Sequence, residues 1–139
     1  MKSFTDKNGS AWSINLDVGT LLSIKQELGF DILDNPGDFP ANVSDFVNVL
    51  WVALREQIEN QNLDEIGFAK CLDGETVNTA TDCFIEELAN FFLPVDKAKA
   101  QAVRGMWDNL KNLKEIEAKT VENLLGVVSS GLAASSGST

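Results

Sequence analysis

The segment from Val43 to Ile58 constrains the fold most, because it is the longest dense run of apolar side chains in the chain. Apolar residues recur in it at helical intervals and others fill the flanks, so a helix over this segment is apolar nearly all round. A helix of that kind belongs at the centre of a core. We therefore expect the other elements to pack around Trp51, with Ser44 or Asp45 capping the start of the helix.

The segments on either side are weaker and amphipathic. Residues 2–16 alternate in the manner of strands about Asn8-Gly9, which predicts a β-hairpin with Phe4, Trp12, Ile14 and Leu16 on its apolar face. Helices are predicted over 18–28, 64–72 and 75–93, with Asp17 and Asp64 as N-caps, Gly29 ending the first helix and Pro94 stopping the last. The predicted fold class is α+β, predominantly α-helical: an N-terminal β-hairpin packed on a helical body, with a longer C-terminal helix.

Charge divides the chain unevenly. Residues 1–93 carry 5 basic and 16 acidic side chains, a net charge of −11, whereas residues 94–139 carry 6 and 5, a net charge of +1. We expect three parts: a hairpin and helical core over 1–93, a helical segment over 94–128, and a flexible tail over 129–139. An acidic chain lacks the Lys and Arg side chains that neutralise phosphates, so we expect no nucleic-acid partner.

The chain contains no apolar stretch long enough to cross a membrane and no apolar leader, so we expect no membrane partner and no secretion. Cys71 and Cys83 lie in predicted helices without a CxxC pattern or a basic neighbour. We interpret them as reduced, buried thiols in a cytosolic protein.

No pattern indicates an enzyme, a cofactor or a metal. Histidine is absent, which removes the commonest general base and metal ligand. The acidic residues Asp31, Asp34, Asp38 and Asp45 could attract a hard cation, but they lack the calcium-loop spacing and include Pro36, which favours solvated turns and caps. Asp82 and Glu86 share a helix face, which we interpret as solvated. We therefore expect no catalytic, metal or cofactor site.

The strongest functional signal is an apolar stripe in the C-terminal third. Its partner-binding candidates are Val103, Met106, Trp107, Leu110 and Leu113. A near-neutral helix with Met and Trp, joined to an acidic body, suits an element that docks on a partner or on another copy of the chain. The alternative is that this helix folds back and completes the chain's own core, and both interpretations stay open.

The order of segments resembles the tail assembly chaperones of long-tailed, siphovirus-like bacteriophages. The resemblance covers about residues 4–93, and the matching segments are WSINL at 12–16, VGT at 18–20, GFDILD at 29–34, VLW at 49–51, FAKCLDGE at 68–75 and EELANFF at 86–92. These are packing and turn patterns rather than chemical motifs.

The resemblance implies a small helical protein of the host cytoplasm that acts during virion assembly and is absent from the mature virion. It would bind and solubilise the tape measure protein, help to recruit tail tube protein, and possess no enzyme activity. Self-association is a further expectation. The alternative from another class is a structural virion subunit of the tail or head-tail connector. An enzyme or ligand-binding regulator would need a pocket of convergent polar groups, for which no pattern exists.

Overall fold

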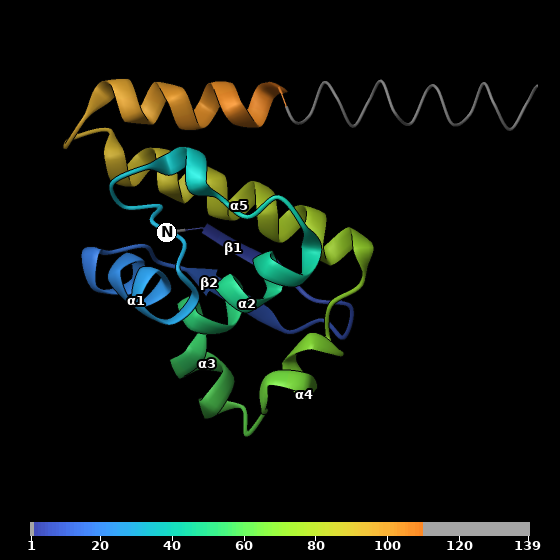
Figure 1. The fold of residues 1–139 in the computed structure, drawn as a ribbon. Helices are drawn as coiled ribbons and strands as arrows, with labels where there is room; N and C mark the ends of the chain where they lie inside the picture. Colours follow the sequence, from blue (N-terminus) through green and yellow to red (C-terminus); the bar gives the residue numbers. More distant parts are fainter. Residues whose placement is uncertain (1, 110–139) are drawn as a thin grey trace, which may run out of the picture. The chain divides into compact units, whose positions relative to one another are not determined.

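The computed structural model describes residues 2–109, and the chain divides into two units between Arg104 and Gly105. The elements of the first unit are β1 (Lys2–Thr5), β2 (Ala11–Ile14), α1 (Val18–Leu28), the 3-10 helix η1 (Pro36–Asp38), α2 (Val43–Ala53), α3 (Arg55–Asn60), α4 (Glu65–Ala69) and α5 (Gly74–Phe92). Residues 97–109 are also helical. The described part is thus predominantly helical with a small antiparallel hairpin, which confirms the predicted fold class (Figure 1).

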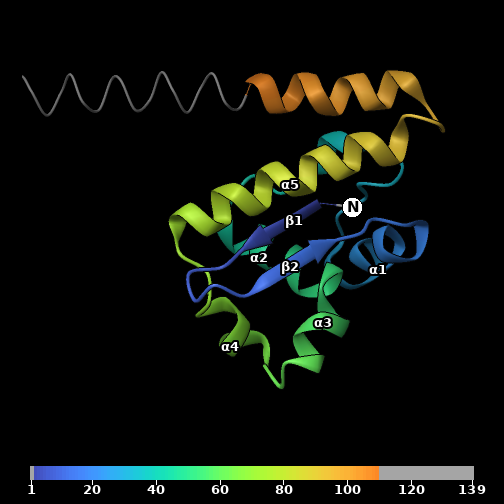
Figure 2. The same cartoon turned by 180° about the vertical axis from the view of Figure 1, so that it is seen from behind.

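The hairpin buries one face and exposes the other. Phe4 pairs directly with Trp12, and together with Ile14 and Leu16 they form the buried face that the alternation predicts. Ser3 and Thr5, on the opposite face, are exposed. Figure 2 looks onto the hairpin, with α2 behind it and α5 running alongside β1. Helices on two sides therefore supply the packing that two strands cannot supply alone.

Asp6 organises the connection between the strands. Its Oδ1 accepts hydrogen bonds from the backbone N–H groups of Asn8 and Ser10 at 2.9 and 3.0 Å, and its Oδ2 accepts one from Trp12 Nε1 at 2.9 Å. Of Asn8 and Gly9, only Gly9 adopts a positive φ, at 87°. The turn is therefore built on the Asp6 side chain as much as on the Asn-Gly pair.

Side chains from the helices form hydrogen bonds with backbone groups on the outer edge of each strand. Gln57 pairs with β2 as a third strand would: it accepts from Ser13 N–H at 3.0 Å and donates to Ser13 C=O at 2.7 Å. On the other edge, Cys83 Sγ donates to the carbonyl of Ser3 at 3.4 Å. Unpaired strand edges invite pairing with other chains, and these contacts occupy part of each edge.

The prediction of a single helix from Val43 to Ile58 is wrong in its continuity. The helix is interrupted at Leu54, where φ is −108° and ψ is 11°, and α3 continues in a new direction. The interruption brings Gln57 to β2 and Arg55 to Glu27, with a 2.6 Å contact between Nη2 and Oε1, while Leu54 and Ile58 both stay buried. The cap also differs from expectation, because Asn42 rather than Ser44 or Asp45 accepts the first-turn N–H.

Trp12, rather than Trp51, is the tryptophan at the centre of the core. Trp12 is fully buried and meets the Phe68 ring edge-on with 5.1 Å between centroids, whereas Trp51 is half-buried. A second aromatic cluster joins Phe39, Phe46 and Phe84 at centroid separations of 5.6 to 5.8 Å. The aromatic contacts therefore join the hairpin to α4, and the loop residue Phe39 to α2 and α5, while Leu21 and Ile24 of α1 are also fully buried.

The expected caps at Asp17 and Asp64 are confirmed, and Asp73 caps α5. Hydrogen bonds from the backbone and side chain of Thr20 lower the pKa of Asp17, and those of Thr76 do the same for Asp73. Both pKa shifts arise because a carboxylate accepts first-turn N–H groups, so their cause is structural. Gly29 ends α1 with a φ of 82°, as expected.

Candidate partner-binding segment

The segment that follows α5 begins with an exposed apolar turn. Leu93, Pro94 and Val95 are all exposed, and the Val95 and Asp96 N–H groups both donate to the carbonyl of Phe92, at 2.9 and 2.7 Å. Asp96 then caps the next helix, since its Oδ1 accepts from the N–H groups of Ala98 and Lys99. A proline that cannot continue the hydrogen bonding of α5 and an aspartate that starts a new helix thus define the turn locally.

Two small side chains and one cation secure the beginning of this helix in the first unit. Ala100 and Val103 are buried there, and Lys99 Nζ lies 5.6 Å from the centroid of the Phe92 ring. The cation over the ring supplements the apolar contact of Ala100 and Val103.

The structure separates the sequence-predicted residues into different environments. Val103 is fully buried, so its side chain is not part of the accessible surface. Met106 and Trp107, in the second unit, are half-buried. Leu110 and Leu113 lie outside the described residues, as do the rest of the predicted 94–128 segment beyond residue 109 and the 129–139 tail. Their role in partner binding stays a prediction.

Sequence reasoning did not select the two residues of this segment that expose the most apolar surface. Leu93 is 49% exposed and Val95 is 72% exposed. The sequence pattern indicated Pro94 only as a residue that stops a helix. The same proline also places its two apolar neighbours in a turn. Their position between two helices was the available signal, because a turn has fewer neighbours to cover a side chain than a helix face has.

Charge also changes at this turn. Residues 1–96 carry 5 basic and 17 acidic side chains, a net charge of −12, whereas residues 97–109 carry three basic side chains and only one acidic one, Asp108. Lys97 and Arg104 are exposed. The segment therefore combines apolar and cationic groups, unlike the acidic body that precedes it.

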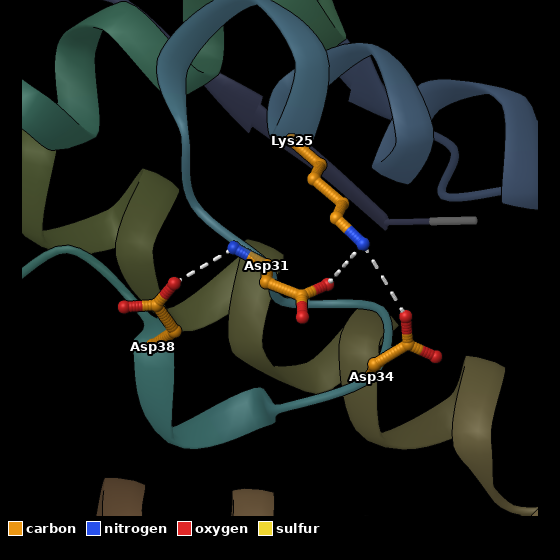
Figure 3. Close-up of polar contacts among 4 residues, drawn as sticks. All are labelled: Lys25, Asp31, Asp34 and Asp38. Carbon is orange, nitrogen blue, oxygen red and sulfur yellow. Dashed lines mark hydrogen bonds and ion pairs between the residues drawn. The ribbon is translucent and has the colours of Figure 1, made fainter.

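The acidic loop after α1 is organised by a lysine. Lys25 Nζ lies 3.5 Å from Asp31 Oδ1 and 3.6 Å from Asp34 Oδ2, and Asp38 Oδ2 accepts from the Asp31 N–H at 2.8 Å (Figure 3). Within residues 2–109, no group of three His, Cys, Asp or Glu side chains is arranged to hold a metal ion. The visible role of these carboxylates is to order the chain between α1 and η1.

Both cysteines are free thiols, with Cys83 buried and Cys71 half-buried. Burial, with smaller effects of the Asp82 and Glu86 carboxylates, raises the pKa of the Cys83 thiol. Because the thiolate is the reactive form, this environment disfavours nucleophilic chemistry at Cys83. Glu86, one of the two acidic residues expected on a solvated helix face, is half-exposed and pairs with Lys2 at 3.1 Å.

Comparison of the chain with protein-family models, curated proteins and solved structures finds no match. Within the described residues, no helix is both long enough and apolar enough to cross a membrane.

Proposed function

We propose that this chain is an assembly chaperone for bacteriophage tails that binds the tape measure protein through its C-terminal segment, keeps it soluble and helps to recruit tail tube protein. The order of segments over residues 4–93 suggests the class. The same class accounts for a small helical protein with a hairpin and an acidic body, and for a C-terminal stripe that contains Met106 and Trp107.

The observation that carries the proposal is the division of that stripe. Val103 is fully buried, whereas Met106 and Trp107, one helical turn further, remain partly exposed. Val103 belongs to the first unit, and Met106 and Trp107 belong to the second. A buried valine followed by a partly exposed methionine and tryptophan suits a helix that is anchored at its start and binds a partner beyond it.

The charge distribution supports the same proposal. A tape measure protein presents long apolar helical seams, which aggregate unless they are covered. An apolar segment attached to a body of net charge −12 would cover such a seam and surround it with mutually repelling charge. Solubility of the partner then follows from the body, and affinity from the segment.

The test is co-expression of the full chain with a tape measure protein from the same phage, followed by affinity capture of the tagged chain. The wild-type chain should keep the tape measure protein in the soluble fraction and copurify with it. Trp107→Ala should weaken capture by about tenfold or more, as for an aromatic hot spot.

Trp51→Ala is the matched control, because Trp51 is also half-buried but lies on α2. It should retain capture as long as circular dichroism shows a folded chain. Equal capture by wild type and Trp107→Ala would overturn the proposed binding segment. Recovery of the tagged chain in purified virions would instead support a structural subunit.

A further inference from the structure

The turn of the β-hairpin contains the chain's only Asn-Gly pair, Asn8-Gly9. Asn8 is exposed, and its side-chain carboxamide takes part in none of the hydrogen bonds within residues 2–109. Gly9 is also exposed, and because it has no side chain, nothing of its own shields its backbone nitrogen. The turn therefore places a carboxamide without a partner next to an accessible backbone nitrogen.

Two such groups can react within the chain, because they are already held in adjacent residues. The Gly9 nitrogen attacks the side-chain carbonyl carbon Cγ of Asn8, a bond forms between them, and the bond from Cγ to Nδ2 breaks. Ammonia leaves with the hydrogen that the Gly9 nitrogen gives up, and a cyclic imide remains. Water then opens the imide at either carbonyl, which gives aspartate or isoaspartate. The reaction consumes water and needs no enzyme or cofactor.

The fold restrains this reaction through Asp6. The Gly9 N–H donates to the Asp6 carbonyl at 3.1 Å, and the Asn8 N–H donates to Asp6 Oδ1 at 2.9 Å. The Lys7 N–H donates to the Cys71 carbonyl at 3.2 Å, where the turn lies beside the connection from α4 to α5 (Figure 2). A nitrogen whose hydrogen is bonded, in a backbone fixed on both sides, must be released by local opening before it can attack.

We propose that Asn8 is a site of spontaneous deamidation, and that Asp6 sets its rate by holding the turn closed. The reaction replaces a neutral side chain with a carboxylate near that of Asp6, and the isoaspartate form also lengthens the backbone by a carbon atom. The longer backbone moves apart the N–H groups of residues 8 and 10, which both donate to Asp6 Oδ1. Because Asp6 Oδ2 accepts from the Trp12 indole, the change extends from the exposed turn to the core. It is independent of tape measure binding.

Asp73-Gly74 provides an internal control. This pair is also exposed and could form the same imide, with loss of water instead of ammonia. Asp73, however, caps α5, where its Oδ1 accepts from the Thr76 N–H at 2.8 Å and from Thr76 Oγ1 at 2.7 Å. These hydrogen bonds lower the pKa of Asp73, so the carboxyl group stays ionised and is a poor target for a nucleophile. We therefore expect modification at residue 8 and none at residue 73.

The experiment is prolonged incubation of the purified full chain at mildly alkaline pH. Mass spectrometry of the peptides that contain residues 8 and 73 follows deamidation, and labelling with isoaspartyl methyltransferase detects isoaspartate. The folded wild-type chain should convert at residue 8 alone. The same chain in concentrated urea should convert at residue 8 about tenfold faster or more, because the turn is open throughout. A folded chain that keeps Asn8 intact, or that converts as fast at residue 73 as at residue 8, would overturn the proposal.

Variants separate the chemistry from the restraint. Asn8→Gln should be inert, because its carboxamide would have to close a larger ring. Asp6→Ala should convert about tenfold faster than wild type, since the open turn becomes more populated when the two N–H groups lose their acceptor. Asp6→Asn keeps a carbonyl oxygen as acceptor and should stay slow, and Lys7→Ala, at an exposed neighbour, should match wild type. Equal rates in wild type and Asp6→Ala would contradict the role of Asp6.

The aged chain tests the effect on the core. Anion exchange isolates it, because deamidation adds a negative charge, and urea unfolding compares it with the fresh chain. The isoaspartate form should unfold at a lower urea concentration than the fresh chain. Asn8→Asp carries the same charge on a backbone of normal length, so it should unfold closer to wild type. An isoaspartate form as stable as the fresh chain would show that the turn does not transmit the change to Trp12.

Discussion

The β-hairpin and the turn after α5 differ in the groups that they leave in contact with water. In the hairpin, a buried carboxylate accepts the indole N–H, and side chains from α3 and α5 bond to the outer strand edges. In the turn, the backbone N–H groups are satisfied, but Leu93 and Val95 remain exposed. The comparison suggests that stability resides in the hairpin, whereas the turn carries surface that the fold does not need.

The largest expected effect tests where the core has its centre. Trp12→Ala should lower the free energy of unfolding by about 3–5 kcal/mol, because it empties a fully buried aromatic site against Phe68. Trp51→Ala should cost less, about 1–2 kcal/mol, since a half-buried side chain removes less area from water. Urea unfolding of both variants gives the comparison. A greater loss of unfolding free energy for Trp51→Ala than for Trp12→Ala would indicate that the core is centred on α2.

The next effect tests the polar contacts of the hairpin. Asp6→Ala should lower the free energy of unfolding by about 1–3 kcal/mol, because the buried Trp12 N–H and two turn N–H groups lose their acceptor. Lys7→Ala, an exposed neighbour in the same turn, should change it by less than about 0.5 kcal/mol.

A double-mutant cycle isolates the indole contact. Trp12→Phe removes the N–H while it keeps an aromatic ring, so the loss caused by Asp6→Ala should be smaller in that background. Strictly additive losses would show that the Asp6–Trp12 hydrogen bond contributes little, and that the turn N–H groups account for the effect.

Local sequence patterns predicted individual strands, helices and caps, but they did not predict contacts between residues that are distant in the chain. Strand alternation about Asn8-Gly9 and the aspartates before two helices gave the hairpin and two caps. The interruption at Leu54 depends on Gln57 reaching Ser13, which is 44 residues earlier in the chain, and no periodicity encodes that pair. The prediction that Trp51 lies at the centre of the core is wrong for the same reason. Trp12 takes that place, and it contacts Asp6 and Phe68 there.

The candidate site shows a similar limit. Helical spacing placed Val103, Met106 and Trp107 on one stripe, but spacing alone does not tell which part of a stripe is covered by the chain's own core. Val103 is buried because the first turns of that helix belong to the first unit. The exposure of Leu93 and Val95 depends on where Pro94 directs the chain, which is a tertiary property.

The smallest expected effect tests the other side of the comparison. Leu93→Ser and Val95→Ser should each change the free energy of unfolding by less than about 0.5 kcal/mol, because side chains that are 49% and 72% exposed contribute little burial. Phe92→Ala, at the adjacent but buried position, should cost about 3–5 kcal/mol and serves as the contrast. If Val95→Ser also cost more than about 1 kcal/mol, the turn would support the core, and its exposure would need no partner. If it costs nothing in stability, the turn carries apolar surface that the fold does not need.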